Sequence, residues 1–308
     1  MRFLSAQSDN DYNIWQLQVQ MFNFKKFGIE DKSIILLGFN PKIGVSDRAL
    51  EFKDSTTARV IFLPDNRDLS DRLYAPSIRP HLIKQLYVEH PHMLENIAVL
   101  YHDCDILFIK LPHIKDLIQK REIYVSDINT HYINRIDIEL IKEMCKIVGI
   151  PSSRVIKNEE TSGGAQYLFN STLNFSYSFW NKVEDDSNNL YKLMLVSSEK
   201  YGSHMFDQSW SADIWALLWN IWLLGVDTEI SPELSFTVAH SPISELEKNN
   251  IYHNAGVTPE MANKFFYKRD FINVSPFGRD LSYVSNEFCS SFYVEEIMGA
   301  SKYYENLK

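Results

Sequence analysis

The sequence has little cysteine, glycine or proline. Its three cysteines, Cys104, Cys145 and Cys289, are widely spaced and form neither a disulfide framework nor a zinc-binding pattern, so a reducing compartment fits best. Glycine and proline number 11 each in 308 residues, and no repeat or low-complexity tract occurs. These absences argue against a disordered or fibrous chain, and a 45% hydrophobic content is enough for a globular core.

Positive charge and long apolar runs are also scarce. The formal net charge of -9 is the opposite of what a dedicated nucleic-acid binder shows, although a local basic patch could still hold an acidic acceptor. The most membrane-like stretch, Trp210 to Val226, is interrupted by Asp213 and Asn220 and falls short of the roughly 20 apolar residues that a span needs. The N-terminus turns polar after Leu4, too soon for a secretory signal. We therefore expect no membrane span and a cytoplasmic protein.

Short apolar runs alternate with longer helical patterns, which is typical of an α/β protein with a mainly parallel, Rossmann-like sheet flanked by helices. The pattern predicts strands at Phe3–Ala6, Ser33–Gly38, Arg59–Leu63, Asn96–Tyr101, Ile123–Ser126 and Ala165–Phe169. It predicts helices at Tyr12–Phe27, Ser77–Tyr87, Ile136–Val148, Thr172–Glu184, Leu190–Tyr201 and Trp210–Leu224. Since no linker stands out, we expect a single domain over residues 1–308, with one half at 1–127 and the other at 128–308.

Two carboxylates one residue apart, Asp103 and Asp105, directly follow the strand Asn96–Tyr101. The carboxyl ends of such strands bind ligands in α/β sheets. Neighbouring carboxylates raise each other's pKa, and a divalent cation removes this conflict. Mn²⁺ and Mg²⁺ prefer carboxylate, water and phosphate oxygens, so the pair predicts a cation that holds a diphosphate. The alternative is an idle, solvated acidic loop, because an isolated Asp-x-Asp often arises by chance.

With this motif, the order of elements resembles the GT-A glycosyltransferases, from the first strand to about Phe277. The resemblance implies that the first half binds a nucleoside diphosphate sugar, which we take to be a UDP-sugar, for transfer to a hydroxyl acceptor on a glycan or protein. A looser resemblance, to hydroxyproline arabinosyltransferase-like and peptidyl-serine galactosyltransferase-like enzymes, is carried by Gly163-Gly164, the tryptophan-rich helix and His253. It leaves the donor sugar and the acceptor open.

The resemblance also implies that a late histidine completes the metal site, and His253 is the candidate. The small residues Ala255 and Gly256 would let backbone amides approach a phosphate. The alternative is a histidine that caps a strand or hydrogen-bonds a carbonyl. Further along, Lys268 or Arg269 would neutralise the β-phosphate.

The segment Lys264–Asp270 interleaves basic and aromatic residues. This pattern also suits single-stranded nucleic acid, or an aromatic strand with a solvated basic face.

The acceptor side is assigned to the second half of the chain. Asp213 opens a helix and is either favoured there by the helix dipole or is the general base for the acceptor hydroxyl. Trp210 would stack on a sugar or base, and Gly163-Gly164 would leave backbone exposed to a ligand. Core positions are predicted for Trp215, Trp219 and Trp222, and a solvated helix end for Glu184–Asp186.

Positions after the early strands supply further donor-binding candidates. Asp65 and Arg79 would bind the nucleobase and the diphosphate, and Gln7 and Asn10 are placed similarly after the first strand.

Three other functions remain open. A glycosyltransferase acting on hydroxymethylated bases in DNA would need phosphate contacts from basic residues such as Lys264 and Arg279. A nucleotidyltransferase would need a Gly- and Lys-rich signature near the first strand, where this chain has Ser5–Asn10. A non-catalytic module would keep only nucleotide-sugar binding. The donor sugar, the acceptor, the stereochemical outcome and the oligomeric state are not readable from the residues.

Overall fold

The computed structural model describes residues 1–119, 122–128, 136–170, 175–201 and 209–307. The fold is mixed α/β, with mostly parallel strands flanked by helices, as predicted. The chain forms two compact units, each assembled from separate segments of sequence. Unit 1 comprises Met1, Leu63–Tyr101 and Lys115–Pro232, and unit 2 comprises Arg2–Phe62, His102–Ile114 and Glu233–Lys308. The expected single domain with halves meeting at residue 127 stays a prediction.

Unit 2 holds two groups of strands. The first has the order β3-β2-β1, and the second is a small sheet with the order β5-β10-β9. These strands are β1 Arg2–Ser8, β2 Ser33–Phe39, β3 Arg59–Pro64 (which ends just inside unit 1), β5 Ile106–Phe108, β9 Phe236–Val238 and β10 Ile251–His253. β1 and β2 run parallel, with Phe3 opposite Ser33. Both strands are almost wholly buried, which explains the continuous apolar sequence of β2.

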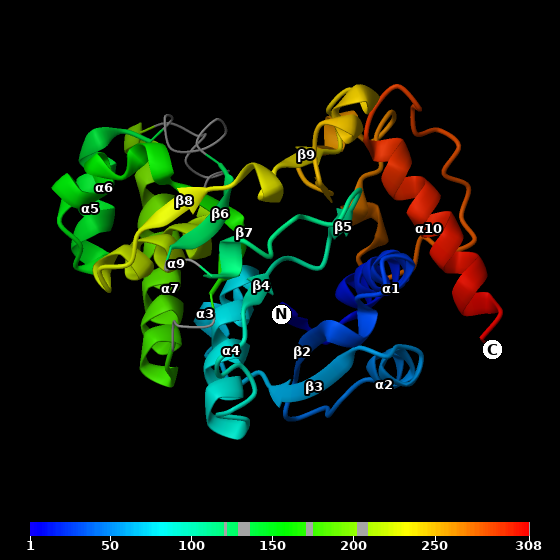
Figure 1. The fold of residues 1–308 in the computed structure, drawn as a ribbon, viewed down its shortest axis with the longest axis horizontal. Coiled ribbons are helices and arrows are strands. Elements are labelled where there is room, and N and C mark those ends of the chain that lie inside the picture. The colour runs from blue at the N-terminus through cyan, green and yellow to red at the C-terminus, as the bar shows by residue number, and fades with distance from the viewer. Residues whose placement is uncertain (120–121, 129–135, 171–174, 202–208, 308) are drawn as a thin grey trace. The chain divides into compact units, whose positions relative to one another are not determined.

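The helices of unit 2 are α1 Asp11–Lys26, α2 Asp47–Asp54 and α10 Ser290–Glu305. α1 begins after Asn10, whose side chain accepts the Asn13 N–H at 2.9 Å and so caps the helix. α1 (blue) packs against α10 (red) in Figure 1. A cluster that includes Trp15, Tyr252 and Tyr293 fills the core between these helices and the small sheet.

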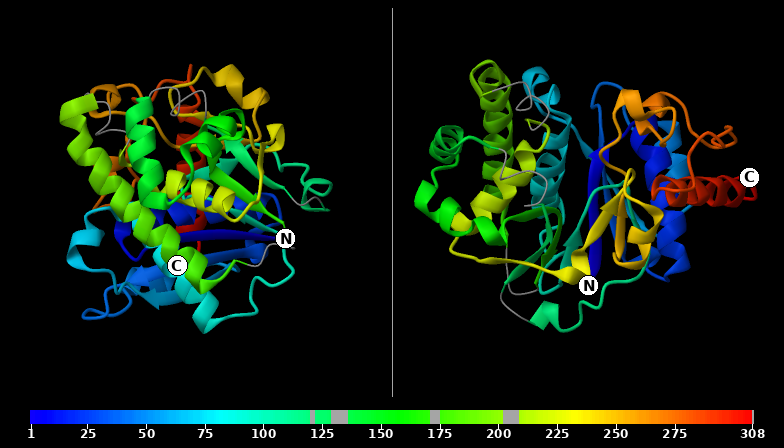
Figure 2. Two further views of the ribbon diagram at one scale, coloured as in Figure 1. Left: turned by 90° about the vertical axis from the view of Figure 1, so that its left-hand side faces the viewer. Right: turned by 90° about the horizontal axis from the view of Figure 1, so that it is seen from above.

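Unit 1 has the strand order β4-β7-β6-β8. Its elements are β4 Val99–Tyr101, β6 Ile123–Asp127, β7 Gly163–Phe169, β8 Thr228–Ile230, α3 Leu69–Arg72, α4 Ile78–Glu89, α5 Ile138–Val148, α6 Ser152–Lys157, α7 Tyr177–Tyr201 and α9 Ala212–Leu223. β7 runs antiparallel to β4 and β6, while β6 and β8 are parallel. α4 and α9 pack against α7, the long yellow-green helix in the left view of Figure 2.

The tryptophan-rich segment is a buried helix, as predicted. Trp215, Trp219 and Trp222 in α9 are at most 2% exposed. No helix in the described parts of the chain is long and apolar enough to cross a membrane.

Helix α7 differs from the prediction in two respects. It is continuous where the sequence predicted two helices, and residues 172–174 of the first lie outside the described residues. The predicted solvated helix end at Glu184–Asp186 is wrong, because this segment lies within α7. Glu184 is 6% exposed and lies 2.9 Å from His81 Nδ1, and Asp186 is 5% exposed and accepts from Asn220 at 2.7 Å. Buried partners on α4 and α9 therefore keep these carboxylates inside.

The glycine pair at the start of β7 is buried by protein. The expectation that Gly163 and Gly164 leave backbone exposed for a ligand is therefore wrong. A Cβ on Gly163 would overlap Val125 and the Ser126 carbonyl, and a Cβ on Gly164 would overlap the Ile214 Cγ2 methyl. Close packing against β6 and α9 thus explains both glycines.

We expect Gly164→Ala to destabilise the protein, because the new methyl group overlaps Ile214. Overpacking of this kind costs about 1–3 kcal/mol, which denaturant unfolding will measure. Ile214→Ala removes the overlapping methyl, so the double variant is expected to lose less stability than the two single losses combined. Strict additivity of the two losses would contradict this packing explanation.

Candidate metal site

The pairing of two short strands places the late histidine next to the Asp-x-Asp loop. β5 runs antiparallel to β10, with Ile106 opposite His253. One residue further on, the Asn254 N–H donates to the Asp105 carbonyl at 3.0 Å. Asp105 and His253 therefore lie at the same end of this strand pair, although they come from distant parts of the sequence.

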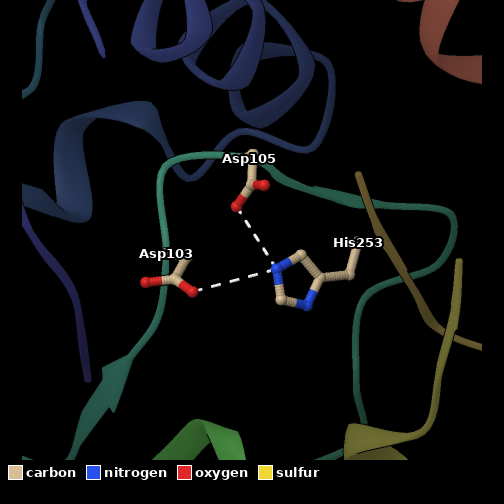
Figure 3. Close-up of side chains that lie close together, drawn as sticks. All are labelled: Asp103, Asp105 and His253. Atoms are coloured by element: carbon tan, nitrogen blue, oxygen red, sulfur yellow. Dashed lines mark ion pairs between the residues drawn. The ribbon is translucent and has the colours of Figure 1, made fainter. Parts of the chain in front are cut away.

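Figure 3 shows the three predicted metal ligands together, with the His253 ring facing both carboxylates. His253 Nε2 lies 3.3 Å from Asp105 Oδ1 and 3.8 Å from Asp103 Oδ2. One ligand atom from each residue lies within 4.8 Å of the others. The side chains of Asp105 and His253 are 7% and 11% exposed, against 21% for Asp103. Asp103 is therefore the most solvent-accessible of the three predicted ligands.

An ammonium group compensates the most buried carboxylate, since Lys268 Nζ forms an ion pair with Asp105 Oδ2. Burial by itself would raise the pKa of Asp105, but the attraction of Lys268 and His253 outweighs it and holds this pKa well below its usual range. Burial by itself would lower the pKa of Lys268, and Asp105 outweighs it in turn, so this pKa is raised. Asp105 is thus a carboxylate and Lys268 an ammonium ion.

The two carboxylates suit Mn²⁺ or Mg²⁺, and a neutral imidazole is an acceptable third ligand for Mn²⁺. His253 Nε2 is the ring nitrogen that faces the carboxylates. Its Nδ1 is buried and has no hydrogen-bond partner among the described residues, so packing helps to hold the ring, with Phe236 at a centroid distance of 5.6 Å. A cation at Nε2 would turn repulsion between Asp103 and Asp105 into shared coordination.

Two amide side chains of α1 hold the segment that carries the carboxylates. The Gln20 amide donates to the Asp103 carbonyl at 2.9 Å and to the Ile106 carbonyl at 3.1 Å. Asn23 accepts the Phe108 N–H at 2.9 Å and donates to the Phe108 carbonyl at 3.1 Å. These amides therefore take the place of a strand neighbour, since β5 is at the edge of its sheet among the described strands.

Sequence reasoning missed these two residues, although a signal was present. Asn13, Gln16, Gln20 and Asn23 recur at helical spacing on α1, and all four are at most 9% exposed. Buried amides require hydrogen-bond partners. An amide stripe on an otherwise apolar helix face therefore predicts polar backbone packed against it.

Two further donor-binding candidates lie in unit 2. Gln7 is in β1 opposite Leu37 and is 8% exposed. Gly256 follows His253 with φ +82°, and a Cβ there would lie 2.8 Å from the His240 ring. Both the backbone conformation and the neighbouring ring therefore favour glycine. The predicted contacts of Gln7 and Gly256 with a donor stay predictions.

The remaining candidates lie in unit 1, where they contact other protein groups. Both oxygens of Asp65 accept from Arg67 at 3.0 Å. Burial alone would raise the pKa of Asp65, but the guanidinium group of Arg67 outweighs burial, so this pKa is lowered. Arg79 lies 2.7 Å from Asp213 Oδ2, and the Tyr74 hydroxyl lies 2.9 Å from Asp213 Oδ1. The donor-binding roles of Asp65 and Arg79 and the catalytic role of Asp213 stay predictions.

No protein-family model matches the chain, and no curated protein matches it. Solved structures of glycosyltransferases resemble it. The WbbM bifunctional glycosyltransferase is 11% identical with a TM-score of 0.46, and the match covers 99% of this chain and 51% of that one. This chain thus spans about half of WbbM.

The galactosyltransferase LgtC, solved with donor and acceptor sugar analogues, is 12% identical with a TM-score of 0.45, over 96% of this chain and 95% of that one. Mouse xyloside xylosyltransferase 1 is 14% identical with a TM-score of 0.37, over 84% and 98%. At these identities and scores the likeness does not assign an activity to this chain.

Proposed function

We propose that this protein is a metal-dependent glycosyltransferase, which moves a sugar from a nucleoside diphosphate sugar, specifically a UDP-sugar, to a hydroxyl group of a glycan or protein. One observation carries the proposal: Asp103, Asp105 and His253 meet in one largely buried cluster beside Lys268. In the proposal, the three ligands hold Mn²⁺ or Mg²⁺. The cation, when bound, screens the negative charge that develops on the leaving diphosphate.

The other residues are assigned by their chemistry. Lys268 supplies a second positive charge for the diphosphate, and the backbone at Gly256 approaches a phosphate closely. Gln7, Asp65 and Arg79 are the further donor contacts of the proposal.

Asp213 is the proposed general base for the acceptor hydroxyl. Its carboxylate lies 2.7 Å from the Arg79 guanidinium group, so accepting a proton would require this ion pair to open. The formal net charge of -9 supports a glycan or protein acceptor over a polyanionic one.

Thermal unfolding in the presence of nucleotide sugars tests the proposal. One UDP-sugar is expected to stabilise the protein when Mn²⁺ is present and not when the cation is removed by a chelator. A ligand at about 100 times its Kd stabilises by about 2.7 kcal/mol, which gives a clear shift in Tm. UDP and the free sugar, tested separately, show which part of the donor is bound. If no nucleotide sugar shifts the Tm with either cation, the proposal is wrong.

A further inference from the structure

The amide of Gln20 ties together the two ends of the Asp-x-Asp loop. Gln20 is 0% exposed, and its Nε2 donates to the carbonyls of Asp103 (2.9 Å) and Ile106 (3.1 Å), on either side of Asp105. An amide nitrogen carries two hydrogens, so these two bonds use both. The orientation is defined, because the opposite one would direct the amide oxygen at two carbonyl oxygens.

Asp105 has two further attachments, which leave it less dependent on Gln20. Its carboxylate forms an ion pair with Lys268, and its carbonyl accepts the Asn254 N–H at 3.0 Å. At Asp103, the carbonyl is held by Gln20 and by the ring of His102, whose Nδ1 lies 2.9 Å from it. Loss of the Gln20 amide would therefore leave these attachments of Asp105 in place and would remove one of the attachments of Asp103.

We infer that Gln20 is a positioning residue of the metal site, which sets the separation of the Asp103 and Asp105 carboxylates without contacting the cation. This inference rests on the proposed function, since it assigns the cluster to a cation. The physical reason is that a buried carbonyl that loses a hydrogen-bond donor is drawn toward another donor. A loop that shifts to meet water would no longer present both carboxylates to one ion.

The same helix supplies a matched control. Gln16 lies one turn before Gln20 and is 1% exposed, but its amide donates to the carbonyl of Tyr12 in its own helix, at 2.7 Å. Replacing either glutamine with methionine keeps an unbranched side chain and removes one buried donor. Only the change at Gln20 removes bonds to the metal loop.

The experiment measures Mn²⁺ binding by electron paramagnetic resonance for the full chain and for Gln16→Met, Gln20→Met and Gln20→Glu. Loss of a group behind a metal ligand typically weakens binding about 10- to 100-fold, so Gln20→Met is expected to raise the Kd for Mn²⁺ about 10-fold. Gln16→Met is expected to stay within about twofold of the unmodified protein. Gln20→Glu directs carboxylate oxygens at the same carbonyls and is expected to weaken binding at least as much as Gln20→Met.

Competition between ions separates positioning from general loss of stability. Mg²⁺ demands near-ideal geometry, whereas Ca²⁺ tolerates longer and more varied contacts. The measurement is how well Ca²⁺ and Mg²⁺ each displace bound Mn²⁺. In Gln20→Met, Ca²⁺ is expected to become the better competitor relative to Mg²⁺. In Gln16→Met, the relative strength of the two competitors is expected to stay unchanged.

Two results would overturn the inference and are distinguishable from each other. If Gln20→Met binds Mn²⁺ like Gln16→Met, with the same ion preference, Gln20 has no positioning role even though the metal site stands. If the unmodified protein binds no Mn²⁺ or Mg²⁺, the proposed function fails and the inference fails with it.

Discussion

The Asp105→Asn variant is expected to lose Mn²⁺ binding and, with it, stabilisation by the nucleotide sugar. The amide keeps the shape of the side chain but removes the charge of the most buried carboxylate in the cluster. We expect the Kd for Mn²⁺ to rise by at least about 100-fold. This is the upper end of the effect of replacing a residue that only supports a metal ligand. Titration of Mn²⁺, followed by electron paramagnetic resonance, measures the change. Binding of Mn²⁺ within a few-fold of the unmodified protein would exclude Asp105 as a ligand.

The same variant is also expected to be less stable in the absence of metal. Asp105 is the ion-pair partner of Lys268, whose side chain is 27% exposed. An ammonium group left beside a neutral amide loses a charged hydrogen bond but keeps part of its hydration, so we expect a loss of about 1–3 kcal/mol in unfolding free energy.

Two control variants separate the loss of metal from the loss of stability. Asp103→Asn removes the other carboxylate and leaves the ion pair between Asp105 and Lys268 in place. It is expected to lose metal binding with little loss of stability. The double variant Asp105→Asn/Lys268→Met removes both charges and is expected to recover stability without recovering metal binding, because a buried pair costs less when both partners are replaced.

The first half of the chain was largely predictable from local patterns. The strands predicted at Phe3–Ala6, Ser33–Gly38 and Arg59–Leu63 correspond to β1, β2 and β3, and the predicted helix Tyr12–Phe27 corresponds to α1. Such elements are long and mostly buried, so their apolar periodicity is clear. Helices α2 and α10 and the strands β5, β8, β9 and β10 were not predicted, and each of these strands has only three residues. A strand that short has no measurable periodicity.

The three members of the site were predictable for different reasons. The chemistry of a carboxylate pair after a strand pointed to a cation, and the resemblance to the GT-A glycosyltransferases implied His253 as a third ligand. The structure brings Asp103, Asp105 and His253 together. The ion pair between Lys268 and Asp105 could not be read from the sequence, because nothing local links these positions. It arises from the packing of the segment around Phe266 against α1, where Phe266 lies 5.9 Å from Trp15 between ring centroids.

The errors also have a common physical cause. The carboxylates of Glu184 and Asp186 are buried because α4 and α9 supply cationic and amide partners. The Gly163-Gly164 pair is buried because β6 and α9 occupy the space that side chains would need. In both cases a tertiary neighbour decides whether a polar or small residue faces solvent, and single-sequence patterns do not identify that neighbour.

Replacing Lys268 with methionine is expected to change metal and diphosphate binding in opposite directions. Lys268 and a cation both use the charge of Asp105, so removing the ammonium group leaves this carboxylate entirely to the metal. A neighbouring unit charge is worth about 1 kcal/mol even in water, so Mn²⁺ alone is expected to bind at least roughly fivefold more tightly. UDP is expected to bind more weakly, because the proposed second positive charge for the diphosphate is gone.

Coupling between Mn²⁺ binding and UDP binding distinguishes competition for Asp105 from a simple loss of positive charge. If the proposed function holds, the diphosphate draws Lys268 away from Asp105 in the unmodified protein, so UDP is expected to tighten Mn²⁺ binding and Mn²⁺ to tighten UDP binding by the same factor. In Lys268→Met, the factor by which each ligand tightens binding of the other is expected to fall. The coupling that remains is the part due to direct contact between the metal and the phosphate. Arg269→Met removes the exposed positive charge of the adjacent residue, the other candidate for the β-phosphate. It is expected to leave the coupling unchanged, because the proposal assigns the diphosphate to Lys268. Weaker binding of Mn²⁺ alone to Lys268→Met would show that Lys268 supports the metal site instead of competing with the cation for Asp105.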